Sequence, residues 1–424
     1  MEQIPVQGKY QPYPEYKDSG VEWVGDMPHH WQTKPAFAVV MDQCIKNSDG
    51  AESNVLSLSY GNIVERDVEN NFGLLPESFN TYQIVNQGDI VLRLTDLQND
   101  KRSLRVARST LRGIITSAYL KLACGKELDN RYAYRLLHSY DTTKVFYGMG
   151  GGLRQSMKFE DFRRLPFLLP PLEEQRTIAA FLDYETARID KLIARQQRLI
   201  ELLKEKRQAV ISHAVTKGLN PDAPMKDSGV EWLGEVPEHW QVAKLSYVLK
   251  LKSGDGITSE DIEPEGSYPV FGGNGVRGYT TKYNCYGDFV LIGRQGALCG
   301  NINIAKGRFY ASEHAVVVHP QKQCGITFIS EFLRLMDLGQ YSVSAAQPGI
   351  SVERINMLYI ALPPYAEQVS IGEQVTEVKA KIELLMMQAS KGIELLKERR
   401  TALISAAVTG KIDLRGWTAP TQGQ

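Results

Sequence analysis

The residues best suited to chemistry in this sequence are arginines and glutamines in or after glycine-rich turns. In the second half of the chain, FGGNGVRGYT carries Arg277 and Tyr279, and GRQGALCGN carries Arg294 and Gln295. Arginine and glutamine are the side chains that make bidentate hydrogen bonds to guanine and adenine in the major groove of DNA. We therefore predict that these four residues contact DNA.

The first half of the chain offers a comparable set within a basic stretch. Residues 93–112, RLTDLQNDKRSLRVARSTLR, hold six basic and two acidic residues, with serine and threonine between them. This composition suits contacts to phosphates and base edges, although a solvated loop or helix face would show it as well. A later Arg-Gln pair, and a glutamine 193 residues after its arginine, add three candidates. The predicted DNA-binding residues from these segments are Arg93, Lys101, Arg102, Arg105, Arg108, Arg154, Gln155 and Gln347.

The sequence lacks the motifs of common catalytic and cofactor sites. It contains no GxxxxGK[ST], HExxH or GxSxG, the motifs that carry nucleotide binding, zinc chemistry and serine nucleophiles. The seven histidines have no metal-ligand spacing, and the five cysteines form no CxxC pair. We expect no catalytic residue, no metal and no cofactor in this chain, and a reduced, cytoplasmic setting.

Composition narrows the class of protein further. The 424 residues include 49 basic and 49 acidic residues, so the formal net charge is zero. A neutral total argues against a generic polyanion binder, which is usually basic, but it leaves room for a local basic patch. No apolar run approaches the roughly 18 residues that a membrane span needs. The polar start of the chain also lacks the apolar core of a signal peptide.

Repeated segments lie before and after the parts of the sequence that hold these candidates. YKDSGVEWVGDMPHHWQ (16–32, leader 1) and MKDSGVEWLGEVPEHWQ (225–241, leader 2) are identical at 12 of 17 positions and hold four of the five tryptophans. Aromatic residues beside a turn-forming Gly and a Pro are typical of a docking surface, since interfaces are rich in aromatics. We predict a partner-docking role; the alternative is that these side chains fill a small core. The four residues are Trp23, Trp31, Trp232 and Trp240.

A second repeat predicts two long helices. LPPLEEQ and LPPYAEQ place proline and glutamate where a helix begins, and IELLKEKRQAVISHAVT and IELLKERRTALISAAVT follow. Apolar residues recur at steps of four and three, a heptad seam, over helices of about 45 residues. We predict that the two helices pair in antiparallel fashion; the alternative is that each packs on its own domain. The predicted seam is Ile189, Ile193, Ile200, Leu203, Val210, Ile382, Met386, Ile393, Leu396 and Leu403.

The segments between the repeats differ from each other. Residues 33–164 (domain 1) and 242–357 (domain 2) share little beyond GDIVL and GDFVL. We interpret them as one fold with two different surfaces; drift after gene duplication is the alternative. The predicted organisation is leader and domain 1 over 1–164, a helix over 165–219, leader and domain 2 over 220–357, a helix over 358–416 and a tail over 417–424. The fold class is then α+β: two mixed α/β domains separated by two long antiparallel coiled-coil helices, in a pseudo-two-fold repeat.

This arrangement resembles the specificity subunit of type I restriction-modification enzymes. The resemblance rests on the two leaders, the two LPP-x-x-EQ helix starts, the two IELLKE(K/R)R segments and the two GD(I/F)VL strands, and it covers nearly the whole chain. It implies that each domain is a target recognition domain for one half of an asymmetric, bipartite DNA site. The paired helices would set the gap between the halves.

The resemblance also implies partners. They would be two adenine-N6 methyltransferase subunits, which bind S-adenosylmethionine, and restriction subunits that use ATP and Mg²⁺ to translocate and cleave DNA. The specificity subunit itself would be non-catalytic, in agreement with the missing motifs.

Three other functions stay open on the sequence. The first is the DNA-specificity component of a restriction system whose partner chain carries both nuclease and methyltransferase. The second is a methyltransferase with degenerate motifs, which tight binding of S-adenosylmethionine would favour. The third is a coiled-coil scaffold without DNA contact, for which no salt-dependent DNA binding would exist.

Overall fold

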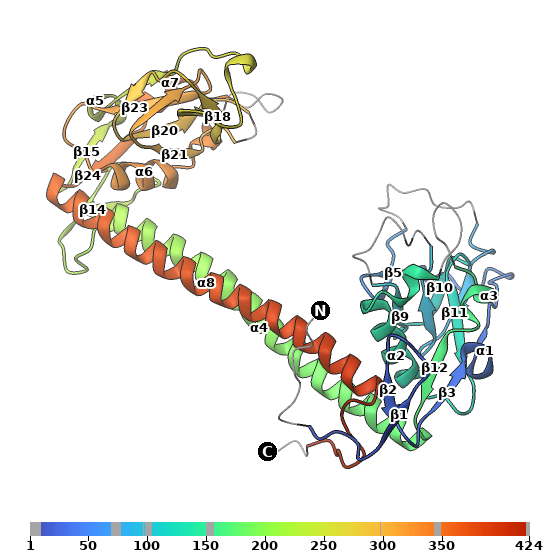
Figure 1. The fold of residues 1–424 in the computed structure, drawn as a ribbon. Coiled ribbons are helices and arrows are strands. Elements are labelled where there is room, and N and C mark those ends of the chain that lie inside the picture. Colours follow the sequence, from blue (N-terminus) through green and yellow to red (C-terminus); the bar gives the residue numbers. More distant parts are fainter. Residues whose placement is uncertain are drawn as a thin grey trace. The chain divides into compact units, whose positions relative to one another are not determined.

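The chain divides into two compact units, each with its own core. Unit 1 comprises Met1–Gln196 and Lys391–Gln424, and unit 2 comprises Gln197–Ser390. The division crosses both long helices, α4 (Leu172–Lys217) and α8 (Tyr365–Val408), so each unit holds a segment of each helix (Figure 1). The structure, a computed structural model, describes residues 10–68, 78–95, 97, 104–149, 157–296, 298–342 and 349–420.

The two long helices combine start signals, an apolar seam and glycine stops. Pro170 and Pro171 precede α4, and Glu174 lies in its first turn. Proline loses no helical hydrogen bond there, and the carboxylate faces the positive end of the helix dipole. Just past the two helices, Gly218 (φ +77°) and Gly410 (φ +72°) adopt the left-handed conformation typical of helix C-caps. α4 has 46 residues and α8 has 44, as the heptad pattern predicts.

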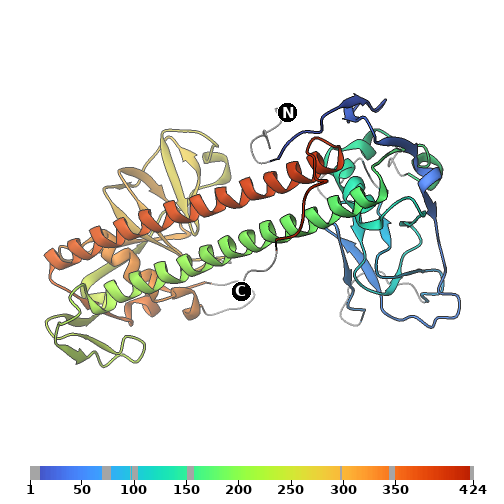
Figure 2. The same ribbon diagram turned by 90° about the horizontal axis from the view of Figure 1, so that it is seen from below.

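Within each unit the two helix segments lie side by side and run antiparallel (Figures 1 and 2). In unit 1, Arg400 Nε lies 3.4 Å from Asp190 Oδ1, and in unit 2, Arg207 Nη1 lies 3.8 Å from Glu383 Oε1. All ten predicted seam residues are buried or half-buried. The predicted antiparallel pairing is therefore confirmed.

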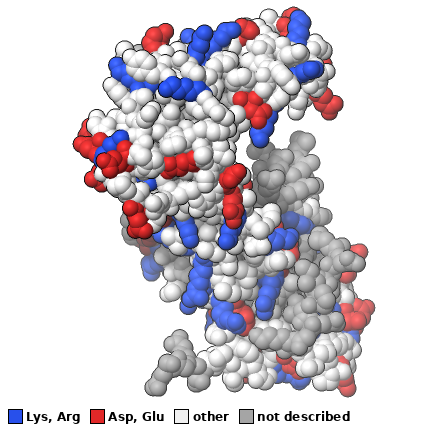
Figure 3. Space-filling model, turned by 90° about the vertical axis from the view of Figure 1, so that its left-hand side faces the viewer, with Lys and Arg blue, Asp and Glu red and all other residues white. Residues whose placement is uncertain are grey.

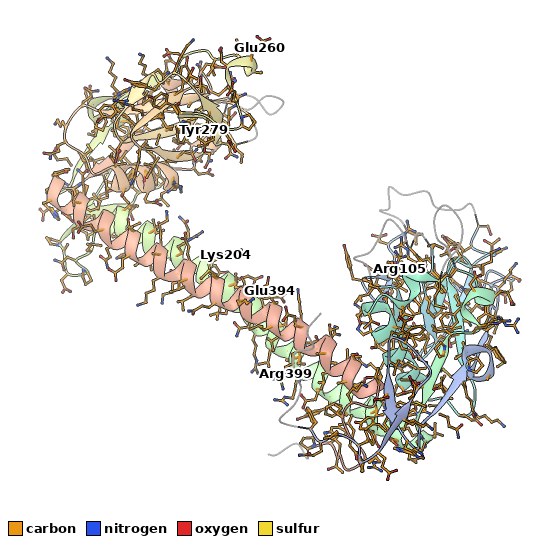
Figure 4. The ribbon with its side chains drawn as sticks, in the orientation of Figure 1. Arg105, Lys204, Glu260, Tyr279, Glu394 and Arg399 are labelled. Carbon is orange, nitrogen blue, oxygen red and sulfur yellow. The ribbon has the colours of Figure 1, made fainter. Side chains whose placement is uncertain are left out.

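The outer faces of these helices carry charges of both signs. Lys204 on α4, and Glu394 and Arg399 on α8, are exposed (Figure 4). Such mixed charge suits a solvated helix face.

Unit 1 contains leader 1 and domain 1. The leader forms a hairpin, β1–β2, and the strand that follows it, β3, pairs with β12, the strand directly before α4. Between them lies a four-stranded antiparallel sheet in the order β4-β11-β8-β9, with two further strand pairs, β5–β6 and β7–β10. The strands are β1 (Tyr16–Asp18), β2 (Asp26–Pro28), β3 (Gln32–Pro35), β4 (Val40–Asp42), β5 (Leu56–Ser59), β6 (Asn62–Glu65), β7 (Gln83–Val85), β8 (Ile90–Leu92), β9 (Val106–Arg108), β10 (Gly113–Ile115), β11 (Leu120–Cys124) and β12 (Pro166–Leu169). The short helices are α1 (Ala36–Val39), α2 (Asn130–Thr142), the 3-10 helix η1 (Val145–Gly148) and α3 (Phe159–Phe162).

Unit 2 repeats this plan. Leader 2 forms the hairpin β13–β14, β15 pairs with β24, and the central sheet has the order β16-β23-β20-β21. A second sheet, β18-β17-β22-β19, replaces the two small strand pairs of domain 1. The strands are β13 (Met225–Asp227), β14 (Glu235–Pro237), β15 (Gln241–Lys244), β16 (Leu249–Ser253), β17 (Tyr268–Gly272), β18 (Gly275–Thr280), β19 (Cys285–Tyr286), β20 (Phe289–Gly293), β21 (Ile302–Ala305), β22 (Arg308–Ala311), β23 (Ala315–Pro320) and β24 (Tyr359–Leu362). The helices are α5 (Leu245–Val248), η2 (Ser259–Asp261), α6 (Ile326–Leu335), η3 (Leu338–Tyr341) and α7 (Val352–Asn356).

One inner strand of each central sheet, β8 in unit 1 and β20 in unit 2, has no polar side chain, because both faces of the sheet are covered there. In β8, Ile90 and Leu92 join the core that contains α2, whereas Val91 faces a smaller core with β5 and β10. In β20, Ile292 belongs to the core with α6, and Leu291 faces the core of the second sheet. Alternate residues of a strand point to opposite faces, so these segments must be apolar at every position. One fold with two different surfaces is the arrangement observed.

In unit 1, leader 1 clamps the start of α4 through one buried carboxylate. Glu174 accepts hydrogen bonds from Trp31 Nε1 (3.0 Å) and from the Tyr13 hydroxyl (2.5 Å). Its other oxygen lies 2.8 Å from His30 Nε2. The Glu174 side chain is 6% exposed, and His30 is the partner that remains open to solvent. The buried carboxylate is thereby satisfied, and leaving it unpaired would cost stability.

Unit 2 builds the same clamp from the second copies. Glu367 accepts a hydrogen bond from Trp240 Nε1 (3.1 Å) and lies 2.7 Å from His239 Nε2. The HW of each leader and the EQ of each helix start are thus two parts of one contact. The prediction that Trp31 and Trp240 form a docking surface is wrong: both are 0% exposed, because their indole N–H groups reach these carboxylates.

The other tryptophan of each leader lies at the surface. Trp23 is 43% exposed and Trp232 is 41% exposed. Their rings pack edge-on against Tyr140 (5.9 Å between centroids) and Phe332 (5.7 Å), residues of α2 and α6. Their docking role stays a prediction.

The glutamine after each clamped glutamate ties the helix start to its domain. Gln175 Oε1 accepts from the backbone N–H of Asp129 (2.8 Å), the residue that caps α2. Gln368 Oε1 accepts in the same way from Gly325 (2.9 Å), directly before α6. The EQ pair therefore orients each long helix on two elements of its own unit.

Leader 1 also holds the end of α8, far away in sequence. The Tyr16 hydroxyl donates to the Gly410 carbonyl (3.0 Å), and a Cβ added at Gly410 would lie 2.2 Å from Pro28. At the other helix end, a Cβ at Gly218 would lie 3.4 Å from Trp240. Only glycine leaves room for this approach at Gly410, so the cap residue also serves the leader contact.

The segment that follows α8 packs against other parts of unit 1. The Asp413 backbone N–H donates to the Gln11 carbonyl (2.8 Å), and the Trp417 ring packs edge-on against Phe181 (5.5 Å between centroids). The segment after α8, which carries the fifth tryptophan, therefore contacts both the first segment of the chain and α4.

Candidate nucleic-acid interface

The loops that follow β8 and β20 are held by the same hydrogen bond in both domains. The carbonyl of Leu94 accepts from the backbone N–H of Met157 (2.8 Å), and the carbonyl of Arg294 accepts from that of Ile350 (3.0 Å). Met157 and Ile350 are 193 residues apart, the offset of the helix repeats. These two loops are therefore equivalent in the fold, and we call them loop 1 (93–95) and loop 2 (293–295).

Arg93 and Arg294 are the arginines that follow the GDIVL and GDFVL segments in the sequence, but they do not occupy equivalent positions in the fold. The backbone N–H of Arg93 donates to the Arg105 carbonyl (2.9 Å), and that of Gly293 donates to the Asn301 carbonyl (2.8 Å). Arg93 therefore corresponds to Gly293, because the second copy has one residue more between its Gly-Asp and its loop.

Loop 2 opens into a cavity of about 700 Å³ in domain 2. Its polar lining is Asn274 and Arg277 from the β17–β18 hairpin, Gln295 from loop 2, and His314 from the turn between β22 and β23. Arg277 and Gln295 are exposed. Side-chain amide and guanidinium groups in one concave surface can present several donors to the edge of a base pair.

Close backbone packing explains the glycines of this cavity. A Cβ at Gly293 would lie 2.1 Å from the Gly273 carbonyl oxygen, and one at Gly272 would lie 2.4 Å from Arg277 Cδ. The FGGNG segment is the hairpin turn between β17 and β18, as its sequence favours. The glycines bring the hairpin onto loop 2 and make space for the Arg277 stem.

His314 is a site residue that the sequence analysis missed. Its Nδ1 lies 3.0 Å from Gln295 Oε1, and its Nε2 lies 3.1 Å from Glu313 Oε1. Nineteen residues separate His314 from Gln295, and the antiparallel register of β20 and β23, with Gly293 opposite Ala315, brings them together. A strand-pairing prediction for these two strands would have placed His314 beside loop 2.

The remaining predictions in domain 2 are placed as follows. Tyr279 lies half-buried on β18 (Figure 4). Arg294 is half-buried and donates from Nη1 to Ser253 Oγ (3.2 Å) on β16. Gln347 lies outside the described residues.

In domain 1, the prediction that Arg105 contacts DNA is wrong. Its side chain is 0% exposed, among the elements of domain 1 (Figure 4). Its Nη1 donates to the backbone carbonyls of Thr95 (2.6 Å) and Arg93 (3.4 Å). The guanidinium is therefore used inside the protein, where carbonyl oxygens replace water as its partners.

The other candidates of domain 1 differ in accessibility. Arg93 and Arg108 are half-buried, at the end of β8 and on β9. Lys101, Arg102, Arg154 and Gln155 lie outside the described residues.

The face of the molecule shown in Figure 3 carries charges of both signs. Lys and Arg side chains are interspersed with Asp and Glu over the face in Figure 3. Among the described residues, no group of three or more His, Cys, Asp or Glu side chains could hold a metal ion. In the same part of the chain, no helix has the length and apolar character to cross a membrane.

Comparisons with known proteins agree on one family. The chain is 41% identical over 132 residues to the EcoprrI specificity subunit of Escherichia coli, an alignment that covers 30% of this chain and 33% of that protein. It is 25% identical over 364 residues to the MjaVIII specificity subunit of Methanocaldococcus jannaschii, which covers 78% and 81%.

Solved structures share the fold. A chain from a study of complex assembly and conformational transition in a type I R-M system superposes with a TM-score of 0.68 at 16% identity, over 90% of this chain and 98% of that one. The HsdS subunit of Thermoanaerobacter tengcongensis gives a TM-score of 0.55 at 16% identity, over 91% and 98%.

The family model described as "Type I restriction modification DNA specificity domain" matches residues 115–202 and 237–395, which are more than half of the sequence. The chain belongs to the family of type I restriction-modification DNA specificity subunits.

Proposed function

We propose that this chain recognises DNA sequence for a type I restriction-modification complex, with domain 1 and domain 2 each reading one half of an asymmetric, bipartite site. The observation that carries the proposal is the pair of equivalent loops. Loop 1 and loop 2 share two backbone hydrogen bonds, but their side chains and surroundings differ. One scaffold with two unlike surfaces is what two different half-sites require.

In this proposal the two long helices set the distance between the half-sites. A helix rises about 1.5 Å per residue and DNA about 3.4 Å per base pair. Inserting four residues near Gln196 would add roughly 6 Å of helix. We expect the gap in the recognised site to grow by one or two base pairs, and an unchanged gap would contradict this role.

The chain is proposed to be non-catalytic and to bind no cofactor. Its partners would be two methyltransferase subunits, which supply S-adenosylmethionine chemistry at adenine N6, and restriction subunits, which supply ATP- and Mg²⁺-dependent translocation and cleavage. The missing nucleotide-binding and nucleophile motifs support this division of labour. Extrusion of the target adenine would then belong to the methyltransferase subunits.

The direct test is base-resolution mapping of N6-methyladenine in cells that carry the partner subunits, with and without this chain. We expect one bipartite motif to appear only with the chain. Exchanging residues 33–164 for the corresponding domain of another family member should change one half of the motif and keep the other. Simultaneous loss of both halves would contradict independent reading.

The charge balance predicts how the isolated chain binds. Domain 1 has 18 basic and 15 acidic residues, and domain 2 has 11 and 10. A weakly basic surface gives modest affinity that falls steeply with salt, because binding releases counterions from DNA. We expect tight binding only in the assembled complex, and salt-insensitive nanomolar binding by the isolated chain would contradict this.

A further inference from the structure

Arg105 is buried to a degree that is unusual for an arginine. Its side chain is 0% exposed. Arginine is almost never fully buried without partners, because a charge that is removed from water loses its hydration. A fully buried guanidinium therefore marks a position where its fork of donors has a specific use.

Two backbone carbonyls of loop 1 accept hydrogen bonds from Arg105. Nη1 donates to the carbonyls of Thr95 at 2.6 Å and of Arg93 at 3.4 Å. Nε lies 3.4 Å from the Tyr147 hydroxyl, and the guanidinium carbon lies 5.7 Å from the centre of the Tyr147 ring. The side chain thus joins the loop after β8 to the 3-10 helix η1.

The backbone of Arg105 is fixed from another side. Its N–H donates to Asp141 Oδ2 (2.5 Å), on the last turns of α2, and Asp141 is itself 0% exposed. A hydrogen bond to a buried carboxylate is stronger than one between neutral groups. The result is a short rigid path from α2, through Arg105, to the backbone of loop 1.

Loop 1 lies where the polar cavity of domain 2 has loop 2. The shared bonds of Leu94 and Arg294 make Thr95 equivalent to Gln295, which lines that cavity. Recognition of a base edge needs side chains held to about 0.5 Å. The backbone that carries Arg93 and Thr95 must therefore be held as firmly as the side chains themselves.

We propose that Arg105 is a positioning residue for DNA recognition by domain 1: it fixes the backbone of loop 1 and does not touch DNA. The inference rests on the proposed function. It separates two arginines of one basic stretch, since Arg93 lies half-buried in loop 1 itself and Arg105 holds the loop from inside the domain.

Domain 2 holds loop 2 by other means. Its residue in the position of Arg105 is Asn301, whose Nδ2 donates to Asn274 Oδ1 (2.8 Å) on the hairpin. Loop 2 is also held by the close packing of Gly273 on Gly293 and by the contact between Gln295 and His314. Changes at Arg105 should therefore affect one half-site only.

The test uses the chain assembled with its methyltransferase subunits. Methylation rates are measured on three duplexes: the mapped site, the site with one base changed in the half read by domain 1, and the site with one base changed in the other half. Discrimination is the ratio of the rate on the mapped site to the rate on each changed duplex.

We expect Arg105→Met to lower discrimination in the domain 1 half-site by about tenfold or more, the size of one good base contact, and to leave the other half-site unchanged. The discrimination of Arg105→Lys should lie between those of the wild type and Arg105→Met, because an ammonium group can still donate to one of the two carbonyls. If Arg105→Met does not fold, the same discrimination ratio is measured for Arg105→Lys, and a reduced ratio in the domain 1 half-site alone is the expected result.

Lys121→Met is the matched control. Lys121 is 1% exposed in the same domain, and its Nζ donates to the Ile84 carbonyl (2.8 Å) and lies 3.5 Å from Asp89 Oδ2. Asp89 lies directly before β8, whereas loop 1 follows the end of that strand. The Lys121→Met variant should have a lower melting temperature than the wild type and the same discrimination in both half-sites.

Two results would overturn the inference in distinguishable ways. A site-specific wild-type complex whose Arg105 variants melt earlier but discriminate as before would show a purely structural role, and the proposed function would stand. A wild-type complex that methylates no defined site would overturn the proposed function and this inference with it.

Discussion

The clamp at Glu174 and the clamp at Glu367 come from the same repeated residues but differ in how they are covered. The Glu174 side chain is 6% exposed, and that of Glu367 is 27% exposed. Both bind a leader His-Trp pair, and Glu174 also accepts from Tyr13, which lies before leader 1. The repeat specifies the contact, and residues outside the repeat set how deeply it is buried.

That difference changes the energetics of one motif. A hydrogen bond to a carboxylate contributes little at a solvated site and more where water cannot replace the lost partner. Unit 1 should therefore depend on its clamp more strongly than unit 2 does.

The largest expected effect tests this dependence directly. We expect Glu174→Ala to lower the free energy of unfolding of unit 1 by about 4 kcal/mol, because it leaves Trp31 and Tyr13 donors unpaired in the core. Glu367→Ala should cost unit 2 about 1–2 kcal/mol, since water reaches that site. Amide hydrogen exchange, read separately for each unit, measures both. Equal losses would remove the distinction between the clamps.

A second difference concerns acid. Burial, and then the charges of Arg400 and Arg135, lower the pKa of His138 on α2 to about 4; the equivalent helix of unit 2, α6, has no histidine. Below about pH 6.5, His138 is protonated in the unfolded chain but stays neutral in folded unit 1. Unit 1 therefore loses stability as the pH falls to about 4, by roughly 3 kcal/mol in total.

His138→Leu isolates this contribution. The stability of the variant should change less between pH 6.5 and pH 4 than that of the wild type, and at neutral pH the two should lie close together. Urea unfolding at a series of pH values gives the comparison. Parallel pH profiles for the two proteins would rule out His138 as the source.

A third difference is the tail, for which unit 2 has no aromatic counterpart. Trp417 is half-buried, against Phe181 and Tyr184. Trp417→Ala should cost unit 1 about 2 kcal/mol, below the value for a fully buried tryptophan, and leave unit 2 unchanged. Fluorescence and hydrogen exchange follow both units, and a loss in unit 2 would count against the assignment.

The smallest effect has the opposite sign. Tyr60, at the β5–β6 turn, has φ +46° and is 77% exposed, whereas the β17–β18 hairpin has glycine at its positive-φ position, Gly275. Asparagine tolerates this backbone region better than tyrosine, so Tyr60→Asn should stabilise unit 1 by about 0.5–1 kcal/mol. A lower melting temperature would mean that the Tyr60 side chain has a packing role.

The sequence predicts the long helices well because their signals are local. Heptad spacing, Pro-Pro starts and glycine stops each depend on neighbours within a few residues. The two-domain plan follows from the repeats, and the shared sheet from the GD(I/F)VL strands.

The site is harder to predict because its determining contacts join distant residues. Trp31 reads as an exposed aromatic until Glu174, 143 residues later, is seen to accept its N–H. Arg105 looks like any cation of a basic stretch, since its acceptors are backbone carbonyls, which every residue has. His314 reaches Gln295 only through strand pairing. Sequence patterns identify surfaces better than they distinguish a residue that touches a ligand from one that supports it.

The division of the units has a consequence for synthesis of the protein. Unit 2 is one continuous stretch, whereas unit 1 joins residues at both ends of the chain. A ribosome releases the chain from its N-terminus, and domains fold as they emerge. Unit 2 can therefore complete its core while unit 1 still lacks Leu403, Ala407 and Val408, which belong to its own core. Unit 1, although its first residues are made before unit 2, can complete its core only after the last turns of α8 have emerged, and a chain released before α8 would expose the apolar face that α8 would have covered.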